Sequence, residues 1–323
     1  MVVTLADGAD PEAVRRELAR RGVWGQLLEA DPAGPQQLLC SPHSAGTTAA
    51  ALRTIPGVRF VSSQRSGHPL VDAQGPVVVV GGVAIGGGPP VWMCGPCSVE
   101  SPEQIDGLAQ RLAPLGVTFL RGGAYKPRSS PYAFQGSGRA GLGWLRSAAD
   151  RAGMQVVTEA LSETEVGAVA EHADLVQVGS RNMANHALLA AVGRTGRPVL
   201  LKRAASATVD EWLLAGEHLL HHGAAGVVFC ERGVRGFDPS TRNLLDLGAV
   251  ALLSQVHRLP VLVDPSHAAG RRDLVPALAR AGLAAGAAGL LIEVHDDPGA
   301  ARSDGPQALS TAQLGELRAG TLS

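Results

Sequence analysis

From Val91 onward, short apolar runs alternate with helical patterns, and this alternation constrains the fold more than any other feature of the sequence. Helical patterns such as Pro102–Ala113, Arg139–Ala152 and Thr208–His221 separate the apolar runs. There are eight runs of strand type: Val91–Cys94, Val117–Leu120, Gln155–Thr158, Asp174–Val178, Val199–Leu201, Gly226–Cys230, Val261–Val263 and Gly289–Ile292. Eight βα units predict an α/β fold of the TIM (β/α)8 barrel type. A doubly wound open sheet is the alternative, but no GxGxxG follows the first run to support dinucleotide binding.

Residues 1–66 are predicted to form a small α+β domain of their own. The expected elements are a strand at Val2–Leu5, a helix at Pro11–Arg21, strands at Val23–Leu28 and Gln37–Cys40, a helix at Ser44–Thr54 and a strand at Val58–Ser62. This βαββαβ order is ferredoxin-like. No polar cluster in it resembles an active site, so we expect a regulatory or oligomerisation domain.

Residues 67–90 are rich in glycine and proline and are expected to link this domain to a barrel at 91–323. The runs Val77–Val80 and Val83–Ile85, joined by two glycines, predict a β-hairpin that covers the base of the barrel.

Composition excludes several classes of protein. The 323 residues are 45% hydrophobic, which is enough for a large core, and 28 basic against 29 acidic residues give a net charge of -1. The chain therefore has no general attraction for nucleic acid or an anionic membrane. Four cysteines do not make a disulfide framework, and we find neither a signal peptide nor a membrane-spanning run, so a cytoplasmic protein is expected.

Charged residues follow the predicted strands, whereas the opposite strand ends carry Gly116, Gly153, Pro198, Ala225, Pro260 and Ala288. In a barrel, the carboxyl ends of all strands meet at one face, so these charges should surround one pocket. The basic residues among them are Arg121, Lys126, Arg128, Arg181, Lys202 and Arg232. Such a cluster in a nearly neutral chain predicts an anionic ligand, most simply a phosphorylated one.

A second set of residues at the same face has the chemistry of metal ligands. Cys97, His267, Glu293 and Asp304 supply a thiolate, an imidazole and two carboxylates, which suits a divalent transition metal better than calcium or magnesium. They follow the first, seventh and eighth strands, which are neighbours in a closed barrel. Taken singly, His267 also fits a buried core histidine, and Cys97 a small apolar residue. Cys94 and Cys97 also form a CxxC motif, so oxidation that joins them and expels a metal is a further hypothesis.

These residues lie in motifs that resemble the type Iβ 3-deoxy-D-arabino-heptulosonate 7-phosphate (DAHP) synthases, the first enzymes of the shikimate pathway. The motifs, in family order, are Gly95-Pro96-Cys97-Ser98-Val99-Glu100, Leu120-Arg121-Gly122-Gly123-Ala124-Tyr125-Lys126-Pro127-Arg128-Ser129, Leu201-Lys202-Arg203, Cys230-Glu231-Arg232-Gly233, Asp264-Pro265-Ser266-His267 and Ile292-Glu293-Val294-His295. The N-terminal domain is similar to the regulatory domain that some members carry.

The resemblance implies a role for each matching residue. Metal ligands would be Cys97, His267, Glu293 and Asp304, with manganese, cobalt, zinc or iron as the metal. Phosphoenolpyruvate would contact Arg121, Lys126, Arg181, Lys202 and Arg232, with Glu159 and Asp264 nearby. Erythrose 4-phosphate would contact Lys126, Pro127, Arg128 and Ser129. Lys126, His267 and Asp304 would act in catalysis. Ser129 replaces a family threonine, and Ala204 stands where many relatives have glycine.

The resemblance implies a transferase and a set of partners, and two alternative functions remain open. A homotetramer, a tyrosine or phenylalanine effector and a chorismate mutase partner are expected, and no nucleic acid or membrane partner. One alternative is 3-deoxy-D-manno-octulosonate 8-phosphate (KDO8P) synthase, which uses arabinose 5-phosphate and carries Lys-Ala-Asn-Arg-Ser where this chain has Lys126-Pro127-Arg128. The other is a catalytically weak homologue that acts by binding.

Overall fold

The computed structural model describes residues 1–28, 35–41, 43–62, 66–126, 130 and 132–321. Contacts divide the chain into two compact units, Met1–Gly67 and His68–Ser323, and each is described by itself. Pro127, Arg128 and Ser129 lie outside the described residues.

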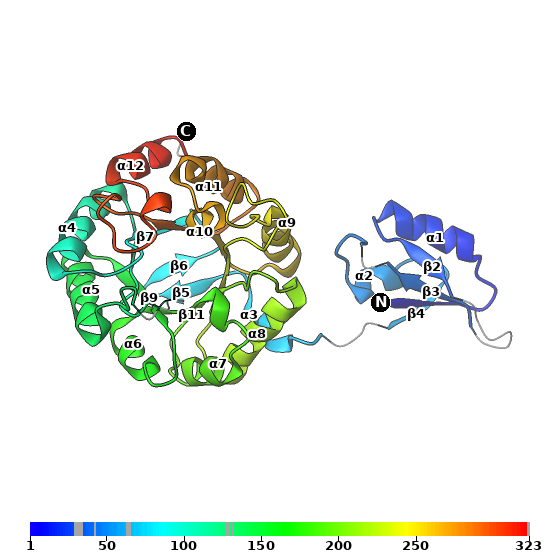
Figure 1. The fold of residues 1–323 in the computed structure, drawn as a ribbon. Coiled ribbons are helices and arrows are strands. Elements are labelled where there is room, and N and C mark those ends of the chain that lie inside the picture. Colours follow the sequence, from blue (N-terminus) through cyan, green and yellow to red (C-terminus); the bar gives the residue numbers. More distant parts are fainter. Residues whose placement is uncertain (29–34, 42, 63–65, 127–129, 131, 322–323) are drawn as a thin grey trace. The chain divides into compact units, whose positions relative to one another are not determined.

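The first unit is an antiparallel sheet covered by two helices (Figure 1). Its strands lie in the order β2-β3-β1-β4, and its elements are β1 (Val2–Leu5), α1 (Pro11–Arg20), β2 (Gly25–Leu27), β3 (Gln37–Cys40), α2 (Ala49–Arg53) and β4 (Val58–Ser62). Val3, Leu5 and Leu38 from the sheet pack against Leu18 and Leu52 from the helices in a core of their own. This order and pairing confirm the predicted ferredoxin-like fold.

Helix α2 is shorter than the predicted Ser44–Thr54. It begins after Thr48, whose hydroxyl accepts a hydrogen bond from the backbone N–H of Ala51 and so caps the first turn. The Ser44 hydroxyl instead accepts from the backbone N–H of Trp24. Residues 44–48, which include a glycine and two threonines, therefore lie before the helix and not in it.

The second unit is a closed barrel of eight parallel strands, as predicted (Figure 1). The strands pair in sequence order around the ring, and β14 closes it by pairing with β7. They are β7 (Val91–Gly95), β8 (Phe119–Arg121), β9 (Gln155–Ala160), β10 (Leu175–Val178), β11 (Val199–Lys202), β12 (Val227–Glu231), β13 (Val261–Val263) and β14 (Gly289–Glu293).

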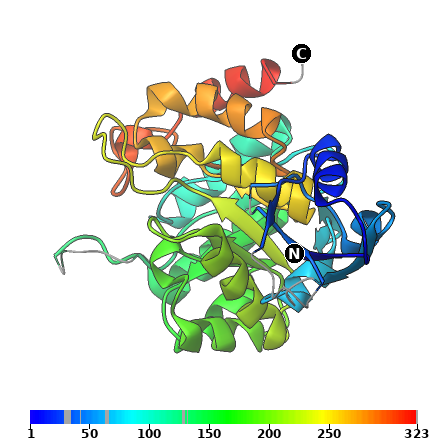
Figure 2. The same cartoon turned by 90° about the vertical axis from the view of Figure 1, so that its right-hand side faces the viewer.

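Helices surround this barrel on the outside (Figure 2). They are α4 (Pro102–Leu112), α5 (Gly138–Ala152), α6 (Val166–His172), α7 (His186–Gly193), α8 (Val209–His221), α9 (Leu247–Ala251), α11 (Val275–Ala284) and α12 (Thr311–Ala319). The short helix α10 (Pro265–Ala269) follows β13 directly and lies inside this ring (Figure 1). The apolar faces of the surrounding helices and the outward side chains of the strands form the main core, which includes Ile105, Leu145, Trp212 and Phe229. Among the described helices, none has the length and apolar character needed to cross a bilayer.

The amino-terminal end of the barrel is closed by a segment that precedes β7. The segment contains α3 (Pro69–Gln74) and a hairpin of β5 (Val78–Val80) and β6 (Val83–Ile85). Val78, Val80 and Ile85 are buried against inward-facing barrel residues such as Met93 and Phe119. Helix α3 is an addition to the sequence prediction. Since the barrel base is sealed by apolar side chains, an open site belongs at the other end.

Candidate functional site

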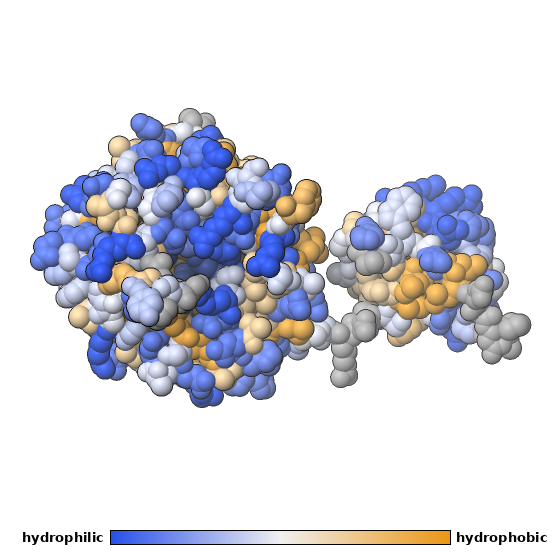
Figure 3. Space-filling model, in the orientation of Figure 1, coloured by the Kyte–Doolittle hydropathy of each residue, from blue (hydrophilic) through white to orange (hydrophobic). Residues whose placement is uncertain are grey.

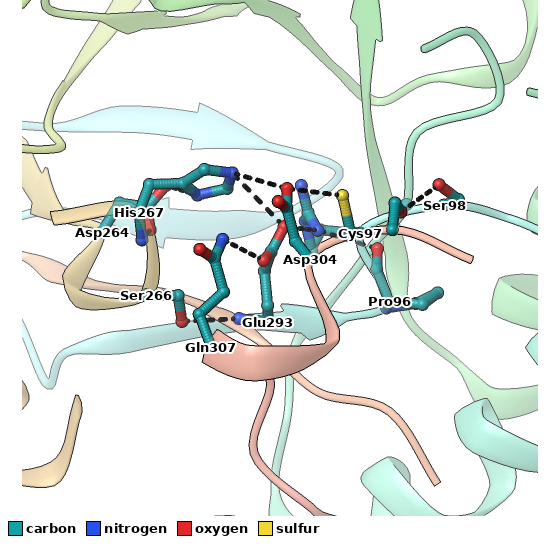
Figure 4. A network of polar contacts seen from close by, with 12 residues as sticks. Pro96, Cys97, Ser98, Asp264, Ser266, His267, Glu293, Asp304 and Gln307 are labelled. Atoms are coloured by element: carbon teal, nitrogen blue, oxygen red, sulfur yellow. Dashed lines mark hydrogen bonds and ion pairs between the residues drawn. The ribbon is translucent and has the colours of Figure 1, made fainter. Parts of the chain in front are cut away.

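Four ligand-type side chains converge at the carboxyl end of β14 and its neighbours (Figure 4). Cys97 Sγ, a carboxylate oxygen of Glu293 and one of Asp304 all lie within 4.8 Å of one another. His267 Nε2 is 3.3 Å from Glu293 Oε1 and 4.0 Å from Asp304 Oδ2. The chain thus brings together a sulfur, an imidazole nitrogen and two carboxylates that come from segments up to 207 residues apart.

His267 is oriented by the short helix α10. Asp264 caps this helix by accepting from the backbone N–H of His267 at 3.0 Å, and its other oxygen lies 2.7 Å from His267 Nδ1. Nδ1 thereby faces Asp264, and Nε2 faces Glu293 and Asp304, so Nε2 is the ring nitrogen that a metal at the cluster would bind. Burial by itself would raise the pKa of Asp264, but the positive charges of His267 and Lys202 hold that pKa well below its usual range. A carboxylate behind a histidine is a common support for a metal ligand.

The charges of the cluster fit a bound cation. Burial would raise the pKa values of Glu293 and Asp304, but positive neighbours, His267 among them, keep both lowered, so both carboxylates are ionised near neutral pH. Burial and the neighbouring Glu293 raise the pKa of the Cys97 thiol to about 11. Asp304 also has a left-handed backbone, with φ 50°, which is unusual outside glycine and asparagine. Mixed sulfur, nitrogen and oxygen donors suit a divalent transition metal.

A cavity of about 740 Å³ opens beside this cluster, and His267 and Asp304 form part of its wall. Figure 3 shows hydrophilic residues around the hollow in the middle of the barrel face. Two carboxylates and six basic side chains of the described residues line the cavity: Glu159 and Asp304, with Lys126, Arg181, Lys202, Arg232, Arg235 and Arg242. The excess of positive charge favours an anionic ligand.

The two lysines of the chain, Lys126 and Lys202, both line this cavity, and all 26 other basic residues are arginines. Lys126 Nζ lies 2.9 Å from the Cys97 carbonyl oxygen and 3.0 Å from Cys97 Sγ. Lys202 Nζ is buried and lies 2.6 Å from Asp264 Oδ2. A lysine ammonium is a compact point charge that can also release a proton, which arginine does not do. The presence of only two lysines in the sequence could have marked both of them as candidate site residues.

Arg121, at the end of β8, lies deeper than the cavity lining. Its Nη1 donates to the Pro96 carbonyl at 2.8 Å and lies 3.0 Å from Glu293 Oε1. Its Nε is buried and has no hydrogen-bond partner among the described residues. An unpaired buried donor is costly, so this nitrogen is suited to an incoming anion.

Of the remaining predicted residues, some line the cavity and others lie outside its lining. Glu159 lines the cavity, and its Oε2 accepts from Gln177 Nε2 at 2.9 Å. Burial lowers the pKa of Arg232. Arg203 pairs with Glu231 and Asp246 at 3.0 and 2.8 Å, outside the residues that line the cavity. Ala204 lies in the wall, and the four cysteines are free, so the Cys94–Cys97 redox hypothesis stays a prediction.

Sequence reasoning missed several residues at this site, chiefly Arg235, Arg242, Asn243 and Gln307. They lie in the long connections after β12 and β14, where no strand or helix period marks them. Their position after a barrel strand was the available signal.

Comparison with known proteins identifies the family. The profile of the DAHP synthetase I family matches residues 62–320. The chain belongs to this family. A phospho-2-dehydro-3-deoxyheptonate aldolase from Thermotoga maritima is 48% identical over 266 residues, which cover 82% of this chain and 77% of that protein. This DAHP synthetase I family member is therefore an enzyme of the DAHP synthase type, as the resemblance implied.

Solved structures agree with this assignment. The crystal structure of the phospho-2-dehydro-3-deoxyheptonate aldolase (DAHP synthase) of Thermotoga maritima matches with a TM-score of 0.78 and 39% identity, covering 99% of this chain and 96% of that one. A truncated form of the 3-deoxy-D-arabino-heptulosonate 7-phosphate synthase from the same organism gives 0.72 and 45%, covering 77% and 92%. A 2-dehydro-3-deoxyphosphooctonate aldolase from Desulfosudis oleivorans is 29% identical, over 74% of this chain and 92% of that protein.

Proposed function

We propose that this enzyme condenses phosphoenolpyruvate with erythrose 4-phosphate to give DAHP and inorganic phosphate, and that the reaction requires a divalent metal. The main observation behind the proposal is that a group of metal-ligand side chains lies beside an anion-binding cavity. Cys97, His267, Glu293 and Asp304 form the group, and the charged residues that line the cavity are mostly basic. Family membership and the Thermotoga maritima relative support the same reaction.

The cations would bind the two phosphorylated substrates. Arg121, Lys126, Arg181, Lys202 and Arg232 are assigned to phosphoenolpyruvate, with Glu159 and Asp264 beside them. Lys126, Pro127, Arg128 and Ser129 are assigned to erythrose 4-phosphate by the family motif alone. Fixing both phosphates holds carbon three of phosphoenolpyruvate near the aldehyde carbon, which replaces a bimolecular encounter by a bound geometry.

In the bond-making step, carbon three of phosphoenolpyruvate attacks the aldehyde carbon of erythrose 4-phosphate. A water then adds to carbon two of the former phosphoenolpyruvate, and phosphate leaves with cleavage of its C–O bond. The metal, manganese, cobalt, zinc or iron, would supply Lewis acidity toward the aldehyde oxygen when bound.

Lys126 is the proposed proton donor to that aldehyde oxygen. Its ammonium lies 3.0 Å from Cys97 Sγ and also lines the cavity, so it reaches both the ligand cluster and the substrate space. His267 and Asp304 would act in catalysis as ligands that face the same space.

The test is phosphate release from phosphoenolpyruvate in the presence of each candidate aldehyde. We expect release with erythrose 4-phosphate, loss of release with a chelator, and recovery with added manganese. Faster release with arabinose 5-phosphate would instead identify a KDO8P synthase, the activity named for relatives at 29 to 32% identity. No product with either aldehyde and added manganese would favour the catalytically weak homologue.

The first unit is proposed to regulate this reaction. It has a core of its own, separate from the barrel core, and is assigned to tyrosine or phenylalanine binding by family resemblance. Inhibition by either amino acid should disappear when residues 1–67 are deleted, and unchanged inhibition would reject the assignment. A homotetramer, a chorismate mutase partner and a cytoplasmic location complete the proposal; light scattering with and without the mutase measures the first two.

A further inference from the structure

Three residues that the sequence analysis did not assign to the site contact the ligand cluster or its support: Arg242, Asn243 and Gln307. Arg242 and Asn243 lie in the connection between β12 and α9, and Gln307 lies in a single 3-10 turn, Gly305–Gln307, before α12. Gln307 is buried, with 3% of its surface exposed. Neither the motifs nor the proposed mechanism assigns a role to any of them.

In each carboxylate of the cluster, one oxygen faces another member of the cluster and the other oxygen contacts Gln307 or Arg242. Gln307 Nε2 donates to Glu293 Oε2 at 2.5 Å, and Glu293 Oε1 lies 3.3 Å from His267 Nε2 and 3.0 Å from Arg121 Nη1. Arg242 Nη1 lies 3.7 Å from Asp304 Oδ1, which leaves Asp304 Oδ2 facing Cys97 Sγ at 3.1 Å. Figure 4 shows the Gln307 amide beside the Glu293 carboxylate, with His267 and Asp304 above both.

Arg242 and Gln307 are themselves connected. Arg242 Nη1 donates to Gln307 Oε1 at 3.2 Å. Because the amide oxygen accepts from the guanidinium, the amide nitrogen must face Glu293, and the orientation of Gln307 is fixed. One arginine therefore acts on Asp304 directly and on Glu293 through a buried amide.

The backbone around Arg242 is anchored to the helix that carries His267. The backbone N–H groups of Arg242 and Asn243 donate to the carbonyls of Ala269 and Ala268 at 3.0 and 2.8 Å, and Asn243 Nδ2 donates to the His267 carbonyl at 3.1 Å. Gly270, with φ 67°, allows this approach, since a Cβ there would lie 2.7 Å from Arg242 Cβ. The position of Arg242 is thus set by the same helix that sets His267.

We propose that Arg242 and Gln307 are positioning residues that select which oxygen of Asp304 and of Glu293 faces the bound metal, with Asn243 fixing the segment to α10. The inference rests on the proposed metal site. Each carboxylate then directs one oxygen toward the metal before the metal binds. Metal binding therefore does not have to order these two side chains, and its entropic cost is lower. Residues that orient metal ligands in this way typically contribute about 10- to 100-fold to metal affinity.

The direction in which metal affinity changes when Arg242 is replaced distinguishes a positioning role from a purely electrostatic one. Arg242 is a cation near the ligand cluster, so removal of its charge alone would strengthen metal binding. Loss of ligand orientation would weaken it. Arg235 provides a matched control, because it lies in the same connection, lines the same cavity and carries the same charge, and has no hydrogen bond or ion pair to Asp304, Glu293 or Gln307 among the described residues.

The experiment is a Co²⁺ titration of the full-length protein after removal of metal, followed by the thiolate-to-cobalt absorption band that reports binding at Cys97. We expect Arg242→Met and Gln307→Leu each to weaken Co²⁺ binding about 10- to 100-fold and to change the cobalt ligand-field spectrum. Arg235→Met should bind Co²⁺ at least as tightly as wild type, with an unchanged spectrum. The double variant, Arg242→Met with Gln307→Leu, should bind Co²⁺ only slightly more weakly than Gln307→Leu alone, because both changes interrupt the same chain of contacts.

Three outcomes would overturn the proposal. Tight, unchanged binding by Arg242→Met and Gln307→Leu would reject positioning and leave the metal site intact. Additive losses in the double variant would show that the two residues act separately. Absence of the thiolate band in wild type would reject the metal site and this inference with it. Thermal unfolding without metal checks folding, and Arg242→Met keeps the test open if Gln307→Leu does not fold, because the Arg242 side chain is 47% exposed.

Discussion

The two ends of the eight barrel strands are built from opposite chemistries. At the amino-terminal end, Val78, Val80 and Ile85 of the hairpin pack onto apolar barrel residues. At the carboxyl end, four strands finish on buried charged residues: Arg121, Lys202, Glu231 and Glu293. The amino-terminal end therefore supplies stability by apolar burial, whereas the carboxyl end holds charges that burial by itself disfavours.

The buried charge pairs at the carboxyl end are weak grounds for stability. Arg121 pairs with Glu293 and Lys202 with Asp264, and all four side chains are at most 6% exposed. The loss of hydration on burial offsets much of the attraction within such pairs, and apolar replacements of similar volume are often neutral or stabilising. Their presence at this end fits a catalytic role, and the following changes test the division between the two ends.

The largest effect on activity is expected from loss of a metal ligand. Cys97→Ala or His267→Ala should reduce kcat/KM by about 1000-fold or more, since Lewis acidity contributes several kcal/mol to the transition state. Steady-state kinetics with added manganese and a thermal unfolding scan without metal measure the two quantities together. Near-normal turnover in either variant would remove that residue from the site.

Lys126→Met should come next. The variant should lose about 10²- to 10⁴-fold in kcat, the usual contribution of a positioned proton donor, and should keep its metal. Lys126→Arg is the control that retains the charge but donates protons poorly. If the arginine variant keeps wild-type turnover, Lys126 acts as a charge only. Metal content by elemental analysis distinguishes loss of chemistry from loss of the ion.

The pH dependence of metal affinity is a smaller, graded effect. Burial and Glu293 raise the pKa of the Cys97 thiol to about 11, so at neutral pH the free site is protonated and each bound metal must release that proton. Affinity should therefore rise about tenfold per pH unit between pH 7 and 9, and fall as the pH is lowered. Titrations in buffers of different ionisation enthalpy count the released protons. A flat profile would contradict a thiolate ligand.

The smallest effect on activity is expected at the closed end. Ile85→Ala removes a fully buried side chain from the hairpin and should lower the free energy of unfolding by about 2 to 5 kcal/mol. Turnover at low temperature should change little, because the hairpin lies at the opposite end of the strands from the cavity. Denaturant unfolding and kinetics on one preparation make the comparison. A large loss of kcat without a loss of stability would show that the two ends are coupled.

The barrel was predictable because most of its strands are short apolar runs that are buried on both faces and alternate regularly with helical patterns. The site was predictable where a charged residue directly follows a strand, as at Arg121, Lys202 and Glu293. Prediction failed where position depends on tertiary contacts. Arg242 reaches Asp304 only because its loop is hydrogen-bonded to α10, and α2 starts late because of one capping hydroxyl.

We propose that the open end of the barrel holds one divalent cation among Cys97, His267, Glu293 and Asp304. The most direct measurement is anomalous X-ray scattering from a crystal of the full chain grown with manganese. We expect one strong peak within bonding distance of Cys97 Sγ, His267 Nε2 and one oxygen each of Glu293 and Asp304, with Arg242 and Gln307 on the other two oxygens. A peak elsewhere, or none at saturating manganese, would contradict it.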